Sequence, residues 1–159
     1  MNGFVSYCHA DYQMFRSFRG HLRTIERAYN LRFWSDERIN AGHLWNDQIM
    51  CAIAAADVFV LLVSPEFIAS DYIWEKELPA IQQRRGRSDV LVLPVVLHRC
   101  LWQMVAAVLQ ALPTADGAVK PVAEWHPQRN GFDRAREQVG RSVEAYFGVG
   151  ATTVQWGAP

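Results

Sequence analysis

The segment Val58–Val63, with the sequence VFVLLV, is the feature that most constrains the fold. Six consecutive apolar residues, three of them valine, predict a strand that is buried on both of its faces. Ser64 and Pro65 end the run, because proline offers no N–H group to a strand ladder. Strands of this kind occur almost only in parallel sheets that lie between two layers of helices.

Around this strand, short apolar segments alternate with longer segments of helical periodicity. Further strands are expected at residues 3–7, 31–34 and 89–97, with Pro94 at a strand end or a bulge, and an edge strand near residues 121–123. Helices are expected after Asp11, which would cap the first one, and over residues 44–56, 66–85, 101–112 and 130–147, with an interruption near Ser70. Alternating strands and helices predict a parallel sheet covered on both faces, with ligands bound at the carboxyl ends of the strands.

Composition narrows the class of protein. A length of 159 residues is that of one domain, and 16 basic residues balance 16 acidic ones, which disfavours a nucleic-acid partner. Cys8, Cys51 and Cys100 form no CxxC pair and are odd in number, as expected of reduced thiols in a cytoplasmic protein. The N-terminus lacks the pattern of a signal peptide, and no apolar run is long enough to span a membrane.

Several common sites have no matching motif in the sequence. No GxGxxG follows the first expected strand, and the chain has neither a GxxxxGK[ST] loop nor a GxSxG elbow. The five histidines include no HxxxH pair. The sequence therefore predicts no bound cofactor and no metal site.

Three segments, taken in order, resemble the boxes of the TIR (Toll/interleukin-1 receptor) domain family in its bacterial form. They are FVSYCHAD at residues 4–11, FWSDERINAGHLWNDQI at residues 33–49 and VFVLLVSPEFIASDYIWEKEL at residues 58–78. The segment LPVVLHRCLWQ at residues 93–103 and the spacing of Trp125 and Phe132 also fit the family. The resemblance covers nearly the whole chain.

This resemblance implies a flavodoxin-like α/β fold with a central, mostly parallel five-stranded sheet and helices on both faces. The TIR domain would cover residues 1–147, and residues 148–159 would be a linker or tail towards a sensor domain, in the same chain or a separate one. Some TIR domains only assemble with one another as signalling scaffolds. Others cleave NAD at the nicotinamide–ribose bond, and bacterial ones often do so in antiphage defence after oligomerisation.

The resemblance places the family's functional glutamate on Glu77, and the residue pattern agrees. On one helix Ile73, Glu77 and Ile81 share an apolar face, whereas Glu75 points about 160° away. Nicotinamide leaves a cationic pyridinium as a neutral molecule and needs no proton. One carboxylate that stabilises an oxocarbenium-like state is then sufficient. The alternative is a helix glutamate held by a cap or by a nearby arginine.

Residues at the ends of the first and third boxes are candidates for substrate binding. Ser6 and Tyr7 end the first expected strand and either line the pocket or serve to cap the turn and to pack. His9 either contacts the phosphate or ribose of NAD or is a solvated loop residue. Tyr72 and Trp74 flank the turn before Glu77, and one of them is expected at the pocket.

The loop after the second expected strand supplies the remaining candidates. Asp36 and Arg38 either gate the site and contact a neighbouring TIR domain or pair with each other on the surface. Leu44 and Trp45 fall where the family places its pocket hydrophobics, and the indole suits a flat aromatic ligand. Trp45 would otherwise pack the loop onto the domain.

The sequence thus predicts a cytoplasmic NAD nucleosidase that other TIR domains activate by forming an oligomer or filament with it. NAD is the substrate, no further cofactor is expected, and the product is ADP-ribose, its cyclic form or an isomer. Two alternatives stay open: a non-enzymatic TIR assembly scaffold, and an effector that subverts the TIR signalling of a host.

Overall fold

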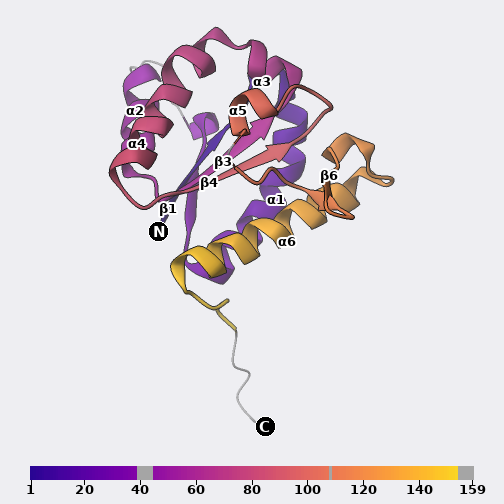
Figure 1. Cartoon of the computed structure of the whole chain (residues 1–159). Helices are drawn as coiled ribbons and strands as arrows, with labels where there is room; N and C mark the ends of the chain where they lie inside the picture. The colour runs from indigo at the N-terminus through magenta and orange to yellow at the C-terminus, as the bar shows by residue number, and fades with distance from the viewer. Residues whose placement is uncertain (39–44, 108, 154–159) are drawn as a thin grey trace.

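The computed structural model describes residues 1–38, 45–107 and 109–153. Its centre is a sheet of four parallel strands: β1 (Asn2–Ser6), β2 (Arg32–Trp34), β3 (Val58–Val63) and β4 (Leu91–Val96). The strands lie in the order β2-β1-β3-β4. Figure 1 shows β1, β3 and β4 at the centre of the domain. All six residues of β3 are buried, so the strand that was expected to be covered on both faces is confirmed.

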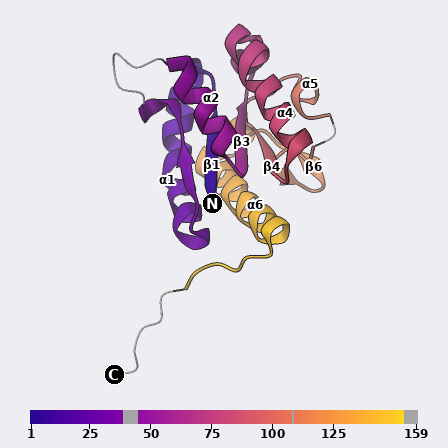
Figure 2. The same cartoon turned by 90° about the vertical axis from the view of Figure 1, so that its left-hand side faces the viewer.

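Two layers of helices cover the sheet, and each has its own apolar core. On one face lie α1 (Tyr12–Tyr29) and α6 (Gln128–Phe147), whose buried side chains pack with alternate residues of the strands. On the other lie α2 (Trp45–Ala55), α3 (Pro65–Ala69), the π-helical turn η3 (Ile73–Glu77) and α4 (Leu78–Arg87). Figure 2 shows α2 and α4 side by side on their face of the sheet.

Shorter elements complete the described part of the chain. They are the 3-10 turns η1 (His9–Asp11), η2 (Asp36–Arg38) and η4 (Val122–Glu124), the helix α5 (Gln103–Ala106) and a hairpin of β5 (Thr114–Ala115) and β6 (Ala118–Val119). No described helix is long and apolar enough to cross a membrane.

The direction of winding reverses between β1 and β3. The chain passes from β1 to its neighbour β2 on one side and then returns to β3 on the other side. In such a sheet, the loops that leave the carboxyl ends of these two strands diverge and open a crevice. The loops after Ser6 and Val63 flank this position.

The expected fifth strand is not formed by the described residues. At the outer edge of β4, Leu112 makes a single bridge: its N–H donates to the Pro94 carbonyl at 2.8 Å, and its carbonyl accepts from Val96 N–H at 2.7 Å. The edge strand expected at residues 121–123 is wrong, because this segment forms the turn η4. Within this segment, only the Ala123 N–H donates a hydrogen bond to the chain at the end of β4, where the Leu97 carbonyl accepts it.

Pro94 was expected at a strand end or a bulge, and this expectation is also wrong. Pro94 lies within β4, in register with Leu61 of β3. The nitrogen and carbonyl of one strand residue point to the same side, and the Pro94 carbonyl faces Leu112. The Pro94 nitrogen, which carries no hydrogen, therefore faces the outer edge of the sheet. The lack of this N–H group costs no hydrogen bond between β4 and β3.

The helical segment after β3 breaks as the sequence predicted. Ser64 caps α3 by accepting a hydrogen bond from Phe67 N–H at 2.9 Å, and Ser70 ends α3 in an extended conformation. The following helix contains the wider turn η3, in which Leu78 N–H donates to the Ile73 carbonyl. Pro79 explains this turn, since its ring cannot donate to, and clashes with, the carbonyl four residues earlier.

Asp11 does not cap α1 as expected. It stands at the N-cap position, but its buried carboxylate accepts a hydrogen bond from Ser64 Oγ at 2.5 Å. This bond ties the turn after β1 to the turn after β3. Asp11 thus fixes two loops at the carboxyl edge of the sheet relative to each other.

The close contact between Gly3 and Phe33 yields a test of the packing of β1 on β2. A Cβ atom on Gly3 would lie 2.3 Å from Cδ1 of Phe33, which is buried in the core. We expect Gly3→Ala to lower the free energy of unfolding by about 1–3 kcal/mol, the usual cost of overpacking. Gly20→Ala in α1, where nothing lies within 4 Å, is the control. In urea titrations it should raise stability by up to about 1 kcal/mol.

The segment after α6 begins at Gly148, which has a left-handed conformation with φ 64°. Val149 packs against the α1–α6 core, and Thr152 N–H donates to the Ala28 carbonyl at 2.7 Å. Residues 154–159 lie outside the described part of the chain. The assignment of residues 148–159 as a linker stays a prediction.

Candidate functional site

A cavity of about 220 Å³, the inner cavity, opens at the carboxyl edge of the sheet beside the switch point. It is formed by the ends of β1 and β2, the start of α2 and the segment around η3. The described residues that line it are Tyr7, Cys8, His9, Asp36, Trp45, Ser70, Tyr72, Ile73 and Glu77. Six of the predicted site residues therefore meet around one hollow, although they come from three separate segments of the chain.

Glu77 is the buried acid of this cavity, with only 6% of its surface exposed. Its Oε2 accepts a hydrogen bond from Ser6 Oγ, so Ser6 contacts the carboxylate from the end of β1. Burial raises the pKa of Glu77 to about 7, and the charge of Asp36 adds to this rise, whereas the Ser6 hydrogen bond and His9 oppose it. Ile73 and Ile81 are also buried and Glu75 is exposed, so the expected apolar face is confirmed.

A second carboxylate, that of Asp36, also lines the cavity. The Asp36 carboxylate is paired with His9 Nε2, a pairing that the sequence did not predict. The expected pairing of Asp36 with Arg38 is not tested, because the Arg38 side chain lies outside the described residues. Asp36 and Glu77 together make the cavity acidic.

Tyr7 serves both of the roles proposed for it. Its ring stacks on Phe15 of α1 with centroids 4.2 Å apart, and it also lines the inner cavity. Burial, followed by the neighbouring Asp36 carboxylate, raises the pKa of Tyr7 far above its ordinary value. The phenol is therefore a neutral wall of the cavity at physiological pH.

Two aromatic rings form the rim. Trp45 and Tyr72 lie with their ring centroids 4.2 Å apart, and the Tyr72 hydroxyl donates to Asn46 Oδ1 at 3.0 Å. Trp45 keeps 40% of its surface exposed. An indole held at the mouth of an acidic hollow can stack on a flat, cationic ligand.

The structure separates the two aromatic candidates before Glu77. Tyr72 lines the inner cavity, whereas Trp74, 39% exposed, is not among the described residues that line it. One of the two was expected at the pocket, and the structure identifies Tyr72 as that residue; the assignment of Trp74 to substrate binding stays a prediction. Leu44 lies outside the described residues, so its assignment stays a prediction.

Sequence reasoning missed three lining residues, namely Cys8, Ser70 and Ile73. Ser70 stands at the helix break that the sequence did predict, and such a break brings a loop to the sheet edge. Cys8 lies two residues after the end of β1, and its sequence position indicated only a reduced thiol. Ile73 was expected on the same helix face as Glu77. Its place in the cavity lining could therefore have been inferred from that of Glu77.

A second hollow of about 470 Å³, the outer chamber, adjoins the inner cavity. The two share Tyr7, His9 and Asp36, and Tyr12 and Glu37 complete the described lining of the outer chamber. Neither hollow offers a metal site within the described residues, where no group of three or more His, Cys, Asp or Glu side chains is close enough to hold an ion.

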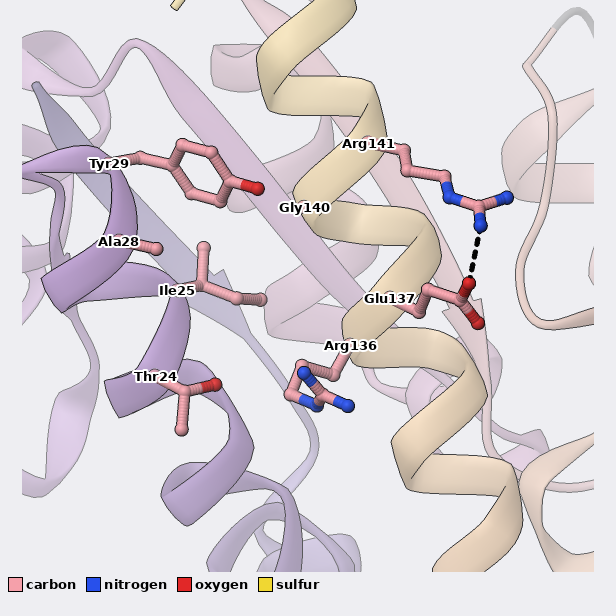
Figure 3. Close-up of a pocket in the computed structure, with 8 residues that line it drawn as sticks. All are labelled: Thr24, Ile25, Ala28, Tyr29, Arg136, Glu137, Gly140 and Arg141. Carbon is pink, nitrogen blue, oxygen red and sulfur yellow. Dashed lines mark hydrogen bonds and ion pairs between the residues drawn. The ribbon is translucent and has the colours of Figure 1, made fainter. Parts of the chain in front are cut away.

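Another groove lies on the helical face, between α1 and α6 (Figure 3). Ile25 and Tyr29 point into it from α1, and Arg136 lies over it from α6. The paired Glu137 and Arg141 of α6 also line it. Tyr29 Oη donates to Glu144 Oε1 at 3.0 Å, which closes one polar contact across the helices. This groove contains no buried acid, unlike the inner cavity.

The fold and the site together define a doubly wound α/β domain with an acidic, aromatic-rimmed cavity at its switch point. The family model described as TIR domain matches residues 4–134. The chain is 33% identical over 146 residues to "Uncharacterized protein y4lF" of Sinorhizobium fredii. That match covers 91% of this chain and 43% of the relative, so the chain spans less than half of that protein. The chain belongs to the TIR domain family, whose members generally interact with other TIR domains.

Proposed function

We propose that this domain cleaves NAD at the bond between nicotinamide and ribose. The observation that carries the proposal is the buried Glu77 carboxylate, which lies in the inner cavity beside the Trp45–Tyr72 rim. A buried acid with a raised pKa in a cavity is a candidate functional group. The family includes such enzymes, which supports the same proposal.

The reaction needs one negative charge near the ribose. As the glycosidic bond breaks, its electron pair leaves with nicotinamide, and positive charge develops on the ribose ring. Water then adds to C1′ and releases one proton, which gives ADP-ribose; attack by a group of the substrate itself would give a cyclic product. The ionised Glu77 stabilises the cation from its buried position in the cavity.

The remaining residues orient the substrate. Trp45 and Tyr72 hold the pyridinium ring, and the negative charges of Asp36 and Glu77 attract the cationic nicotinamide end of the substrate. Ser6 keeps the Glu77 carboxylate in place by donating to one of its oxygens. His9, paired with Asp36, stands where the inner cavity meets the outer chamber.

Assembly with other TIR domains would switch the activity on. Trp45 is open to solvent at the rim, so a neighbouring domain that covers it would complete the site. A sensor domain, in the same chain or a separate one, would drive this assembly. Cytoplasmic NAD depletion on infection, as an antiphage defence, is the role that fits such control.

Nicotinamide release from NAD, followed against protein concentration, tests this function. We expect the rate per molecule to rise steeply with concentration, since two domains must meet to complete a site. A rate per molecule that does not change with protein concentration would contradict activation by assembly. The absence of release from concentrated, assembled protein would contradict the enzymatic function itself.

A scaffold function is the second candidate, and a separate observation favours it. Trp74, Leu101 and Met104 are exposed on the surface, with Leu101 69% exposed. Such side chains suit contacts with another protein. Assembly without nicotinamide release would support this scaffold, or an effector that engages the TIR domains of a host.

A further inference from the structure

The inner cavity has room for only part of a dinucleotide. At about 220 Å³ it is smaller than the roughly 300–1,000 Å³ of pockets that enclose a drug-sized ligand. If the bond to nicotinamide lies beside Glu77, the nicotinamide and its ribose fill this space. The adenosine half then lies elsewhere, and the outer chamber of about 470 Å³ adjoins the cavity along Tyr7, His9 and Asp36.

The outer chamber has an aromatic wall that suits a nucleobase. Tyr12, at the first position of α1, is 38% exposed and lines the chamber. The Arg16 guanidinium lies 6.0 Å from the centroid of its ring. A flat ring with an exposed face stacks on purines with little dependence on their substituents.

Acidic side chains face this wall. Glu37 lines the chamber beside Tyr12, and its hydrogen bond and charge raise the pKa of the Tyr12 phenol. Asp36 lines the chamber as well. Carboxylates accept hydrogen bonds from the hydroxyls of a ribose, whereas a phosphate on the same ribose would be repelled by them. Among the described residues that line the chamber, Asp36 and Glu37 are acidic, and the basic side chain is that of His9, which is paired with Asp36.

We propose that the outer chamber binds the adenosine half of the dinucleotide, with Tyr12 against the base and Glu37 at the ribose hydroxyls, and thereby selects NAD over its 2′-phosphorylated form, NADP. The assignment of the nicotinamide half rests on the proposed function. The selection itself is a property of binding and does not require that the bond be cleaved.

Equilibrium binding of NAD, NADP and nicotinamide mononucleotide to the whole chain tests this proposal. In calorimetric titrations with the cleavage-deficient Glu77→Gln variant at low salt, we expect NAD to bind at least about tenfold more tightly than NADP. Adding Glu37→Gln should narrow this ratio by about fivefold, mainly through tighter NADP binding. Adding Glu75→Gln, an equal change of charge at an exposed site, should leave the ratio unchanged.

Tyr12→Ala separates the base contact from the charge effect. It should weaken NAD binding about fivefold or more, in line with the loss of one stacking contact, without affecting nicotinamide mononucleotide, which has no adenosine. Equal affinity for NAD and NADP, or a Glu37→Gln effect no larger than that of Glu75→Gln, would overturn the proposal. These outcomes are independent of turnover: binding selectivity in the variant, together with no nicotinamide release by the assembled wild type, would support the chamber and refute the proposed enzyme.

Discussion

Replacement of Glu77 by glutamine is expected to reduce nicotinamide release by at least about 100-fold, the usual effect of removing one group that stabilises developing charge. Glutamine has nearly the same shape and its amide oxygen can still accept a hydrogen bond from Ser6. The change therefore removes the negative charge and keeps the packing of η3. The decisive measurement is the release of nicotinamide per molecule at a protein concentration at which the wild type is assembled.

Glu75→Gln is the matched control for this experiment. Glu75 lies two residues away on the same turn, but its side chain is exposed and it does not line the inner cavity. Its substitution should leave the rate within about twofold, because an exposed charge interacts weakly across water. If Glu77→Gln retained full activity, or if both variants lost activity equally, the role of Glu77 as the charge-stabilising group would be refuted.

The sequence predicted the elements whose burial is uniform or periodic. The strand β3 was located to the residue because an apolar run of six residues is typical of a strand in a sheet that lies between two layers of helices. The burial of Ile73, Glu77 and Ile81 followed from their spacing of four residues. Predictions from residue spacing assume an ordinary α-helix, however, and they did not predict the π-helical turn η3. Pro79, which explains this turn, could be seen in the sequence.

Contacts between distant segments were beyond the reach of such arguments. The Asp36–His9 pair joins residues 27 positions apart, and the Asp11–Ser64 bond joins residues 53 positions apart. In each case the sequence offers a nearer partner that is equally plausible. Asp36 could pair with Arg38, and Asp11 could cap α1. The choice between them depends on which loops the sheet brings together, and the order β2-β1-β3-β4 determines this.

The burial of Glu77 should also appear in the pH dependence of stability. The pKa of this carboxyl rises from 4.5, its ordinary value, to about 7 in the folded protein, mainly through burial. The folded state therefore binds the Glu77 proton more tightly than the unfolded state does. The stability that this protonated group contributes is fully present below pH 4.5, falls as the pH rises through 7, and is absent above that value.

Glu77→Gln removes this dependence, because an amide does not ionise in that range. We expect the free energy of unfolding of the variant, relative to the wild type, to increase by about 3 kcal/mol between pH 4.5 and pH 8. Urea titrations at several pH values give this quantity directly, and any constant cost of the new amide cancels in the difference. Glu75→Gln should show no such trend, and a flat difference for Glu77→Gln would mean that the carboxylate is solvated. If Glu77→Gln abolishes nicotinamide release and also stabilises the fold at pH 8, then the burial of Glu77 serves function at the expense of stability. A glutamate with a purely structural role would not be kept at a position where its charge destabilises the fold.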